Sequence, residues 1–171
     1  MISLLTTAQK AVLVAFTSAT IVFSALSVYT VTNYIGVFHA VRMLQLSMSD
    51  FTFEITDETH AIAKTNLNLS NASPYEFYVT LVEQQVYLNE LYAGTARAES
   101  LSSSNPMRLA PQSTANCTLI LNLYFDFLSP EIIELLLNSS SKKSWYLFIN
   151  AALEGPIVGK FDLDLFQEVS A

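Results

Sequence analysis

The sequence is poor in the residue types from which most active sites and metal centres are built. Its 171 residues include one cysteine, Cys117, two histidines and four glycines. One cysteine excludes an intrachain disulfide, and four scattered glycines form no phosphate-binding loop. Neither His39 nor His60 lies in a motif that would pair it with Cys117 as a general base. We therefore expect no catalytic, cofactor-binding or metal-binding residues, and we interpret Cys117 as a small buried hydrophobe.

Charged residues are also scarce, at 13% of the chain against 51% hydrophobic residues, which argues against a disordered protein. The charges are divided unevenly along the sequence. Residues 1–49 contain two bases and no acid, whereas residues 50–171 contain six bases and fifteen acids, giving +2 and −9 and the total of −7. An acidic domain repels phosphate, so we expect no nucleic-acid partner.

One long apolar run occupies the start of the chain, because residues 11–37 carry no charge. A helix needs about 20 such residues to cross the hydrocarbon core of a bilayer. Tyr29 and Tyr34 fall near the end of the run, where an interfacial aromatic belt is expected. We interpret residues 1–40 as a single membrane-spanning or bundle-forming helix, retained as an anchor because the run is long for a signal peptide. Lys10 in the short tail favours an extracytoplasmic, cell-surface domain.

The same run carries small residues along one side. Spacings of three and four residues place six positions on one face of the predicted helix: Ala8, Ala11, Ala15, Ser18, Val22 and Ala25. Small side chains let another helix approach closely in lipid, where helices associate without a hydrophobic driving force. Alanine and serine are also ordinary in membrane helices. We predict that this face packs on partner subunits or on copies of the same chain.

After residue 40 the hydrophobic period changes to two, which indicates β-strands. The first strand alternates until Met48 and resumes in the opposite phase at Phe51, which predicts a β-bulge at Ser49–Asp50. The stretch VYLNELYAG is typical of a hairpin, and two last strands are predicted on either side of Gly155-Pro156. The predicted inward-facing sets are Ala61, Ala63, Thr65, Leu67 and Leu69; Phe77, Val79 and Leu81; and Cys117, Leu119, Leu121, Leu123, Phe125 and Phe127.

One short helix is predicted in SPEIIELLLNSS, with Ser129 as its N-cap and Pro130 at its first position. The strands before and after it show no βαβ alternation, and no composition shift marks a second soluble domain. Residues 41–171 are therefore predicted to form one mainly β domain. We expect an antiparallel immunoglobulin- or fibronectin-III-like β-sandwich that follows the single transmembrane helix.

The order of these segments resembles a known family. FTFEITD is followed by AKTNLNLSNASPYEFYV and VYLNELYAG, and the chain closes with ALEGPIVGKFDLDL. Over roughly residues 41–168 this is similar to the late embryogenesis abundant group-2 domain, also called the water-stress and hypersensitive-response (WHy) domain. In that family an asparagine–proline turn links two strands, whereas here Pro74 lies three residues after Asn71. The resemblance implies a sandwich without catalytic residues, often behind one membrane helix, with stress-related, structural or lipid-handling roles.

Two groups of polar residues could carry chemistry at the surface. Four asparagines occupy N-x-S/T sequons and are candidate glycosylation sites, or alternatively solvated strand and turn residues: Asn68, Asn71, Asn116 and Asn138. We expect Asn68 and Asn116 to point away from the core, and Asn71 and Asn138 to lie in turns. Asp162, Asp164 and Glu168 alternate with apolar residues, which favours a solvated strand face over a cation site.

These features favour a non-enzymatic, membrane-anchored structural or interaction subunit. Its partners would be the lipid bilayer and other membrane or surface subunits, and the assembly would be a membrane complex or a pilin-like surface filament. Two alternatives remain open at this stage. One is a lipid-binding or lipid-transfer module with a cavity lined by Phe77, Phe125 and Trp145. The other is a membrane-tethered desiccation or stress-protection protein.

Overall fold

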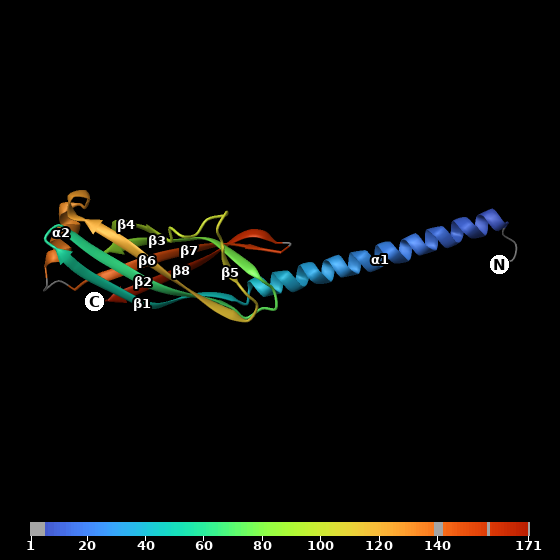
Figure 1. The fold of residues 1–171 in the computed structure, drawn as a ribbon, viewed down its shortest axis with the longest axis horizontal. Helices are drawn as coiled ribbons and strands as arrows, with labels where there is room; N and C mark the ends of the chain where they lie inside the picture. The colour runs from blue at the N-terminus through green and yellow to red at the C-terminus, as the bar shows by residue number, and fades with distance from the viewer. Residues whose placement is uncertain (1–5, 139–141, 157, 171) are drawn as a thin grey trace. The chain divides into compact units, whose positions relative to one another are not determined.

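The chain divides into two compact units, Met1–His39 and Ala40–Ala171. A computed structural model describes residues 6–138, 142–156 and 158–170. The first unit is helical, and the second contains antiparallel sheets and one short α-helix (Figure 1). The structure is thus mainly β with one long apolar helix near the N-terminus, as the sequence predicts.

The long helix α1 spans Thr7–Val41, a length of about 52 Å at ~1.5 Å per residue. It begins with a capping box, a reciprocal pair of bonds at the N-terminus of a helix. The Thr6 N–H donates to Gln9 Oε1 over 2.9 Å, and the Gln9 N–H donates to Thr6 Oγ1 over 3.4 Å. The helix extends beyond the uncharged run at both ends, because helix-forming residues flank it.

The first sheet contains three antiparallel strands in the order β1-β2-β6. These are β1 (Leu44–Asp57), β2 (His60–Asn71) and β6 (Ser113–Tyr124). A register shift between Met48 and Asp50 confirms the predicted bulge. In the β1–β2 turn, Asp57 Oδ1 accepts hydrogen bonds from the Thr59 N–H and hydroxyl over 2.7 and 2.8 Å. These bonds hold the pKa of the Asp57 carboxyl below its usual value.

The second sheet has the strand order β4-β3-β7-β8, and β5 also pairs with the start of β3. Its strands are β3 (Phe77–Leu88), β4 (Leu91–Arg97), β5 (Met107–Leu109), β7 (Ser144–Gly155) and β8 (Gly159–Ser170). Asn89 and Glu90 connect β3 to β4 with φ angles of 47° and 71°. Two successive left-handed residues match the twist of a two-residue hairpin, so the hairpin in VYLNELYAG is confirmed.

The core of the second unit lies between the two sheets. The set predicted on β2 faces inward as expected, and Ala61, Thr65, Leu67 and Leu69 are almost completely buried. From the second sheet, Trp145 is fully buried, and its ring lies 5.5 Å from Phe51 and 4.9 Å from Phe53 of β1. Aromatic and aliphatic side chains from both sheets therefore fill the space between them.

Two predicted inward positions are wrong. In β3 a register shift between Val79 and Leu81 inserts Thr80 as a bulge, after which Val82 rather than Leu81 is buried. The other is Phe127, which is 87% exposed, because β6 ends at Tyr124 and a 3-10 helix, Phe125–Phe127, turns the chain out of the sheet. The alternation of apolar and polar residues predicts which side chains point into the core only while the strand stays regular.

The short helix α2 spans Pro130–Leu137 and begins as predicted. The Ser129 hydroxyl accepts a hydrogen bond from the Ile132 N–H over 3.3 Å, and Pro130 occupies the first turn. Ile132 and Leu136, one turn apart, are buried. These two side chains lie on the same face of the helix and pack that face against the core.

Candidate functional site

The surface of α1 is the most apolar feature of the described residues. An 18-residue window of this helix has a mean hydropathy of 2.1 and no buried residue, so the helix is long and apolar enough to cross a membrane. Its threonine hydroxyls are satisfied within the helix. Thr17, Thr20 and Thr30 donate to the carbonyls four residues earlier over 2.8, 2.9 and 2.8 Å. Such internal bonds remove the cost of placing hydroxyls in lipid.

The structure places all six predicted helix-packing residues on α1, and all six are exposed. At 3.6 residues per turn they lie along one side of the helix, from Ala8 to Ala25. Val22 is the largest of the six, so the side is flattest at Ala11, Ala15 and Ser18. This geometry allows close approach of a second helix, and whether one binds there stays a prediction.

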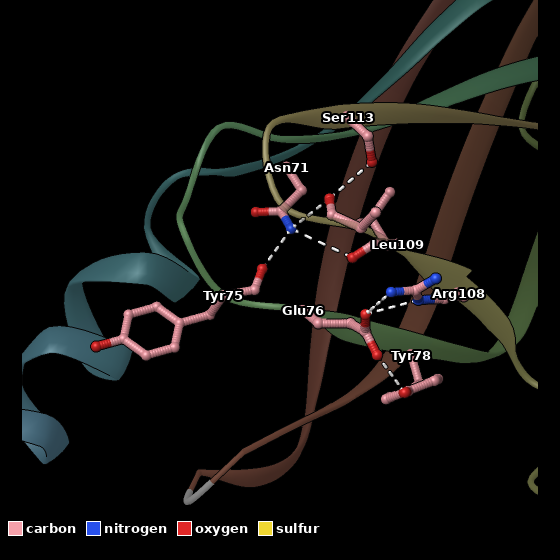
Figure 2. Close-up of polar contacts among 8 residues, drawn as sticks. Asn71, Tyr75, Glu76, Tyr78, Arg108, Leu109 and Ser113 are labelled. Atoms are coloured by element: carbon pink, nitrogen blue, oxygen red, sulfur yellow. Dashed lines mark hydrogen bonds and ion pairs between the residues drawn. The ribbon is translucent and has the colours of Figure 1, made fainter.

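Asn71 forms a buried polar cluster where β2 leaves the first sheet. Its amide Nδ2 donates to the carbonyl oxygens of Tyr75, Leu109 and Ala110, over 2.7, 3.3 and 2.9 Å (Figure 2). Its Oδ1 accepts from the N–H and hydroxyl of Ser73, over 3.0 and 2.7 Å. The side chain is 1% exposed.

The Asn71 cluster connects segments that are distant in the sequence. Tyr75 precedes β3, whereas Leu109 is the last residue of β5 and Ala110 follows it in the connection to β6. One amide thus joins the β2–β3 connection to the end of β5 and the residue after it, and the Ser73 and Ser113 hydroxyls also donate to the carbonyls of Tyr75 and Ala110. The cluster therefore holds the backbone in place where β2 leaves the first sheet.

An exposed ionic cluster lies beside the Asn71 cluster. The Arg108 guanidinium of β5 donates to Glu76 through Nε over 2.6 Å, and the Tyr78 hydroxyl of β3 donates to the same carboxylate (Figure 2). Arg108 first and Tyr78 second hold the pKa of Glu76 below its usual value. The hydrogen bond between Tyr78 and Glu76 raises the pKa of the Tyr78 hydroxyl. The Glu76 carboxylate accepts hydrogen bonds from both Arg108 and Tyr78, and such a group is typical of an exposed ion pair with a structural role.

Asn71 differs from its sequence-based interpretation. It lies at the end of β2, not in a turn, and a glycan on its amide nitrogen would displace the three carbonyl contacts of the folded domain. Asn71 is thus the most buried of the four candidate acceptors, and whether it carries a glycan stays a prediction. The signal for its burial was present in the sequence, because Leu67, Leu69 and Asn71 share the inward phase of β2.

The other three candidate acceptors are more exposed. Asn116 is exposed on β6 and pairs directly with Asn68 of β2, which is half-buried. Directly opposed residues have Cβ atoms about 5 Å apart, too close for two glycans side by side. Asn138 is exposed at the C-cap of α2, and its sequon partners Ser139 and Ser140 lie outside the described residues.

Cys117 and His60 lie far apart in the structure. Cys117 pairs with Leu67 and His60 pairs with Tyr124, so the two lie seven positions apart along the β2–β6 ladder. That separation is about 23 Å at ~3.3 Å per residue. The His60 ring stacks on Tyr124, and its Nδ1 lies 2.9 Å from the Thr56 hydroxyl. Within residues 6–138, 142–156 and 158–170, no three His, Cys, Asp or Glu residues gather as a metal site.

Of the three residues predicted to line a lipid cavity, Phe77 and Trp145 are packed against other rings. Trp145 contacts Phe51 and Phe53, as described above, and Phe77 lies 5.8 Å from Phe161 in an edge-to-face arrangement. Phe125 is 7% exposed at the end of β6. Asp162, Asp164 and Glu168 lie on the exposed face of β8, in agreement with their interpretation as a solvated strand face.

No protein-family model and no curated protein matches this sequence. Solved structures are similar in fold. A protein from Archaeoglobus fulgidus has a TM-score of 0.52 at 13% identity, over 73% of this chain and 96% of its own. A protein from Arabidopsis thaliana has a TM-score of 0.52 at 12% identity, over 74% and 79%. A putative late embryogenesis abundant protein has a TM-score of 0.46 at 9% identity, over 90% and 84%. At such identities the likeness concerns the fold alone.

Proposed function

We propose that this protein is a non-enzymatic, membrane-anchored interaction subunit. Helix α1 anchors it in a bilayer and packs on partner helices, and the acidic domain after residue 40 projects on the extracytoplasmic side. The domain is an immunoglobulin- or fibronectin-III-like sandwich of the late embryogenesis abundant group-2 type. This assignment is supported by the family-like segments and by the Asn71 cluster at the position of the family's turn.

The observation that carries the proposal is the uninterrupted apolar surface of α1. Residues 6–32 are all exposed, and the mean hydropathy of the central window is 2.1. Exposing so many apolar side chains to water is unfavourable by about 25 cal/mol per Å², so the helix requires lipid or a protein partner. The same properties also fit a signal sequence, and membrane retention distinguishes the two.

The anchor is tested by extracting membranes from cells that express the full chain with alkaline carbonate. We expect the protein at its full mass in the membrane pellet, and protease added to the outside should digest the domain. A soluble protein that has lost residues 1–40 would contradict the anchor. A membrane-bound protein whose domain resists external protease would contradict the orientation alone.

The packing face is tested by Ala15→Phe, which places a large ring at the flattest part of the small-residue side. The matched control is Ser24→Phe, on the opposite side of the helix at 3.6 residues per turn. Cross-linking in membranes should show a loss of assembled species for Ala15→Phe only. Equal assembly of both variants and of the natural protein would remove this face as an interface.

A further inference from the structure

The outer face of the second sheet carries five adjacent aromatic rings. We call this set the aromatic face: Tyr87, Tyr92, Tyr146, Phe148 and Phe166. The rings form a continuous series across all four long strands of the sheet. Ring centroids are 5.5 Å apart for Tyr92 and Tyr87, 6.0 Å for Tyr87 and Phe148, 4.8 Å for Phe148 and Phe166, and 6.2 Å for Phe166 and Tyr146.

These rings are not part of the core. Tyr92, Phe148 and Phe166 are 54%, 52% and 53% exposed, whereas the neighbouring residues Val86 and Leu147 face inward and are fully buried. A contiguous exposed apolar patch on a soluble domain marks an interaction site. Tyrosine and phenylalanine are also enriched in protein interfaces over the rest of the surface. The aromatic face therefore has the composition of an interface without an occupant in the described chain.

The row of residues beside these rings is polar and largely acidic. The register places Glu83, Asn150 and Asp164 side by side on adjacent strands, next to the row that holds Phe148 and Phe166. These two rows line a groove of about 520 Å³. On β3, β4, β7 and β8 the outer face carries two bases, Arg97 and Lys160, against five acids: Glu83, Glu154, Asp162, Asp164 and Glu168.

The charges decide which occupant fits. Carboxylates beside the rings repel nucleic acids and anionic lipid headgroups, and a second copy of the chain would bring the same acids against them. The negative faces of aromatic rings attract cations, and arginine can stack on a ring while it donates two hydrogen bonds to a carboxylate. We propose that the aromatic face binds a partner protein that presents arginine or lysine side chains to the groove.

One ion pair on this face shows that a guanidinium binds a carboxylate of the acidic row. The Arg97 guanidinium of β4 donates to Glu83 through Nε over 2.5 Å, at the end of the row that contains Asp164. Asp164 itself accepts a hydrogen bond from the Asn150 amide over 2.9 Å, which holds its carboxylate at the edge of the groove. An incoming guanidinium placed between Phe166 and Asp164 would make the same kind of contact.

The test uses the full chain in a neutral detergent and a fluorescent octa-arginine peptide, with binding measured by anisotropy. We expect Phe166→Ser and Asp164→Asn each to weaken binding by about two- to fivefold. The matched control is Phe127→Ser, which removes an exposed phenylalanine outside the face and should leave binding unchanged. Circular dichroism of each variant confirms that the exposed substitutions leave the fold intact.

Three outcomes would overturn the inference. Equal binding by all three variants would mean that the peptide senses only the overall negative charge. Binding of a neutral oligosaccharide such as cellohexaose that Phe166→Ser abolishes would identify the face as a sugar site. Self-association that Phe166→Ser abolishes would identify a second copy as the occupant. The inference rests on the proposed interaction role, but the tests are separate, because Ala15→Phe should change assembly and leave peptide binding intact.

Discussion

Replacing Asn71 should destabilise the domain more than any other single asparagine substitution on β2. Asn71→Ala removes the donor for three carbonyls and the acceptor for the Ser73 N–H and hydroxyl. A buried polar group that loses its partner costs about 1–3 kcal/mol, and the Ser73 N–H is left without its acceptor, whereas the carbonyls of Tyr75 and Ala110 keep bonds from the Ser73 and Ser113 hydroxyls. With the weakened carbonyl contacts added, we expect a loss of about 2–4 kcal/mol in the free energy of unfolding, a large part of the ~5–15 kcal/mol of a typical domain.

Asn71→Asp gives the sharper version of this prediction because its shape is nearly unchanged. The new oxygen would face three carbonyl oxygens in a buried site, so both desolvation and repulsion raise the pKa of the introduced carboxyl above its unfolded value. A carboxyl with a raised pKa binds more protons in the folded state. The variant should therefore be strongly destabilised at pH 7 and recover stability as the pH falls through that folded pKa.

Urea unfolding of the full chain in detergent, followed by tryptophan fluorescence, measures both effects. Trp145 is the single tryptophan and is fully buried in the same unit. The matched control is Asn68→Ala, a half-buried outward residue on the same strand, which should cost less than about 0.5 kcal/mol. If Asn71→Ala and Asn71→Asp were as stable as this control at pH 7, the cluster would not be what fixes the β2–β3 connection.

Three further predictions follow from packing. Gly155→Ala would place a methyl group 2.6 Å from the Phe77 ring and should lower the free energy of unfolding by about 1–3 kcal/mol, as measured with urea. In the control Gly159→Ala the methyl group meets no atom within 4 Å, so the only destabilisation comes from the backbone strain of a φ of +71°. Burial raises the pKa of the Cys117 thiol, so Ellman's reagent at pH 7 should label the native protein on the order of tenfold more slowly than the protein in urea. In a glycosylating host, intact mass should reveal at most one glycan on the Asn68–Asn116 pair, and two would contradict their direct pairing.

The strands and caps could be predicted because their signals are local. Alternation identified the inward set of β2, the change of phase at Met48 and Phe51 identified a bulge, and Ser129 and Pro130 identified the start of α2. Each of these signals is a contrast between apolar and polar residues at neighbouring positions. Where that contrast exists, the facing of a strand follows from the sequence.

The features that escaped prediction lack such a contrast. Leu81 and Val82 are both apolar, so the bulge at Thr80 left no mark in the pattern. The aromatic face was hidden for the same reason, because both sides of β7 are apolar from Trp145 to Ile149. Asn71 has the inward phase of β2, but an asparagine in a sequon that is followed by a proline is also typical of a surface turn. Its hydrogen bond to Leu109, 38 positions away, shows that the side chain is part of the core.

The molar mass of the native assembly decides whether this chain is an interaction subunit. The full chain should be purified in a mild detergent or in native nanodiscs, and its molar mass measured by light scattering coupled to size exclusion. We predict a protein mass above that of one 18.9 kDa chain, from copies or co-purifying subunits, and a return to one chain for Ala15→Phe but not for Ser24→Phe. A single chain without partners under these conditions would contradict the proposed interaction subunit.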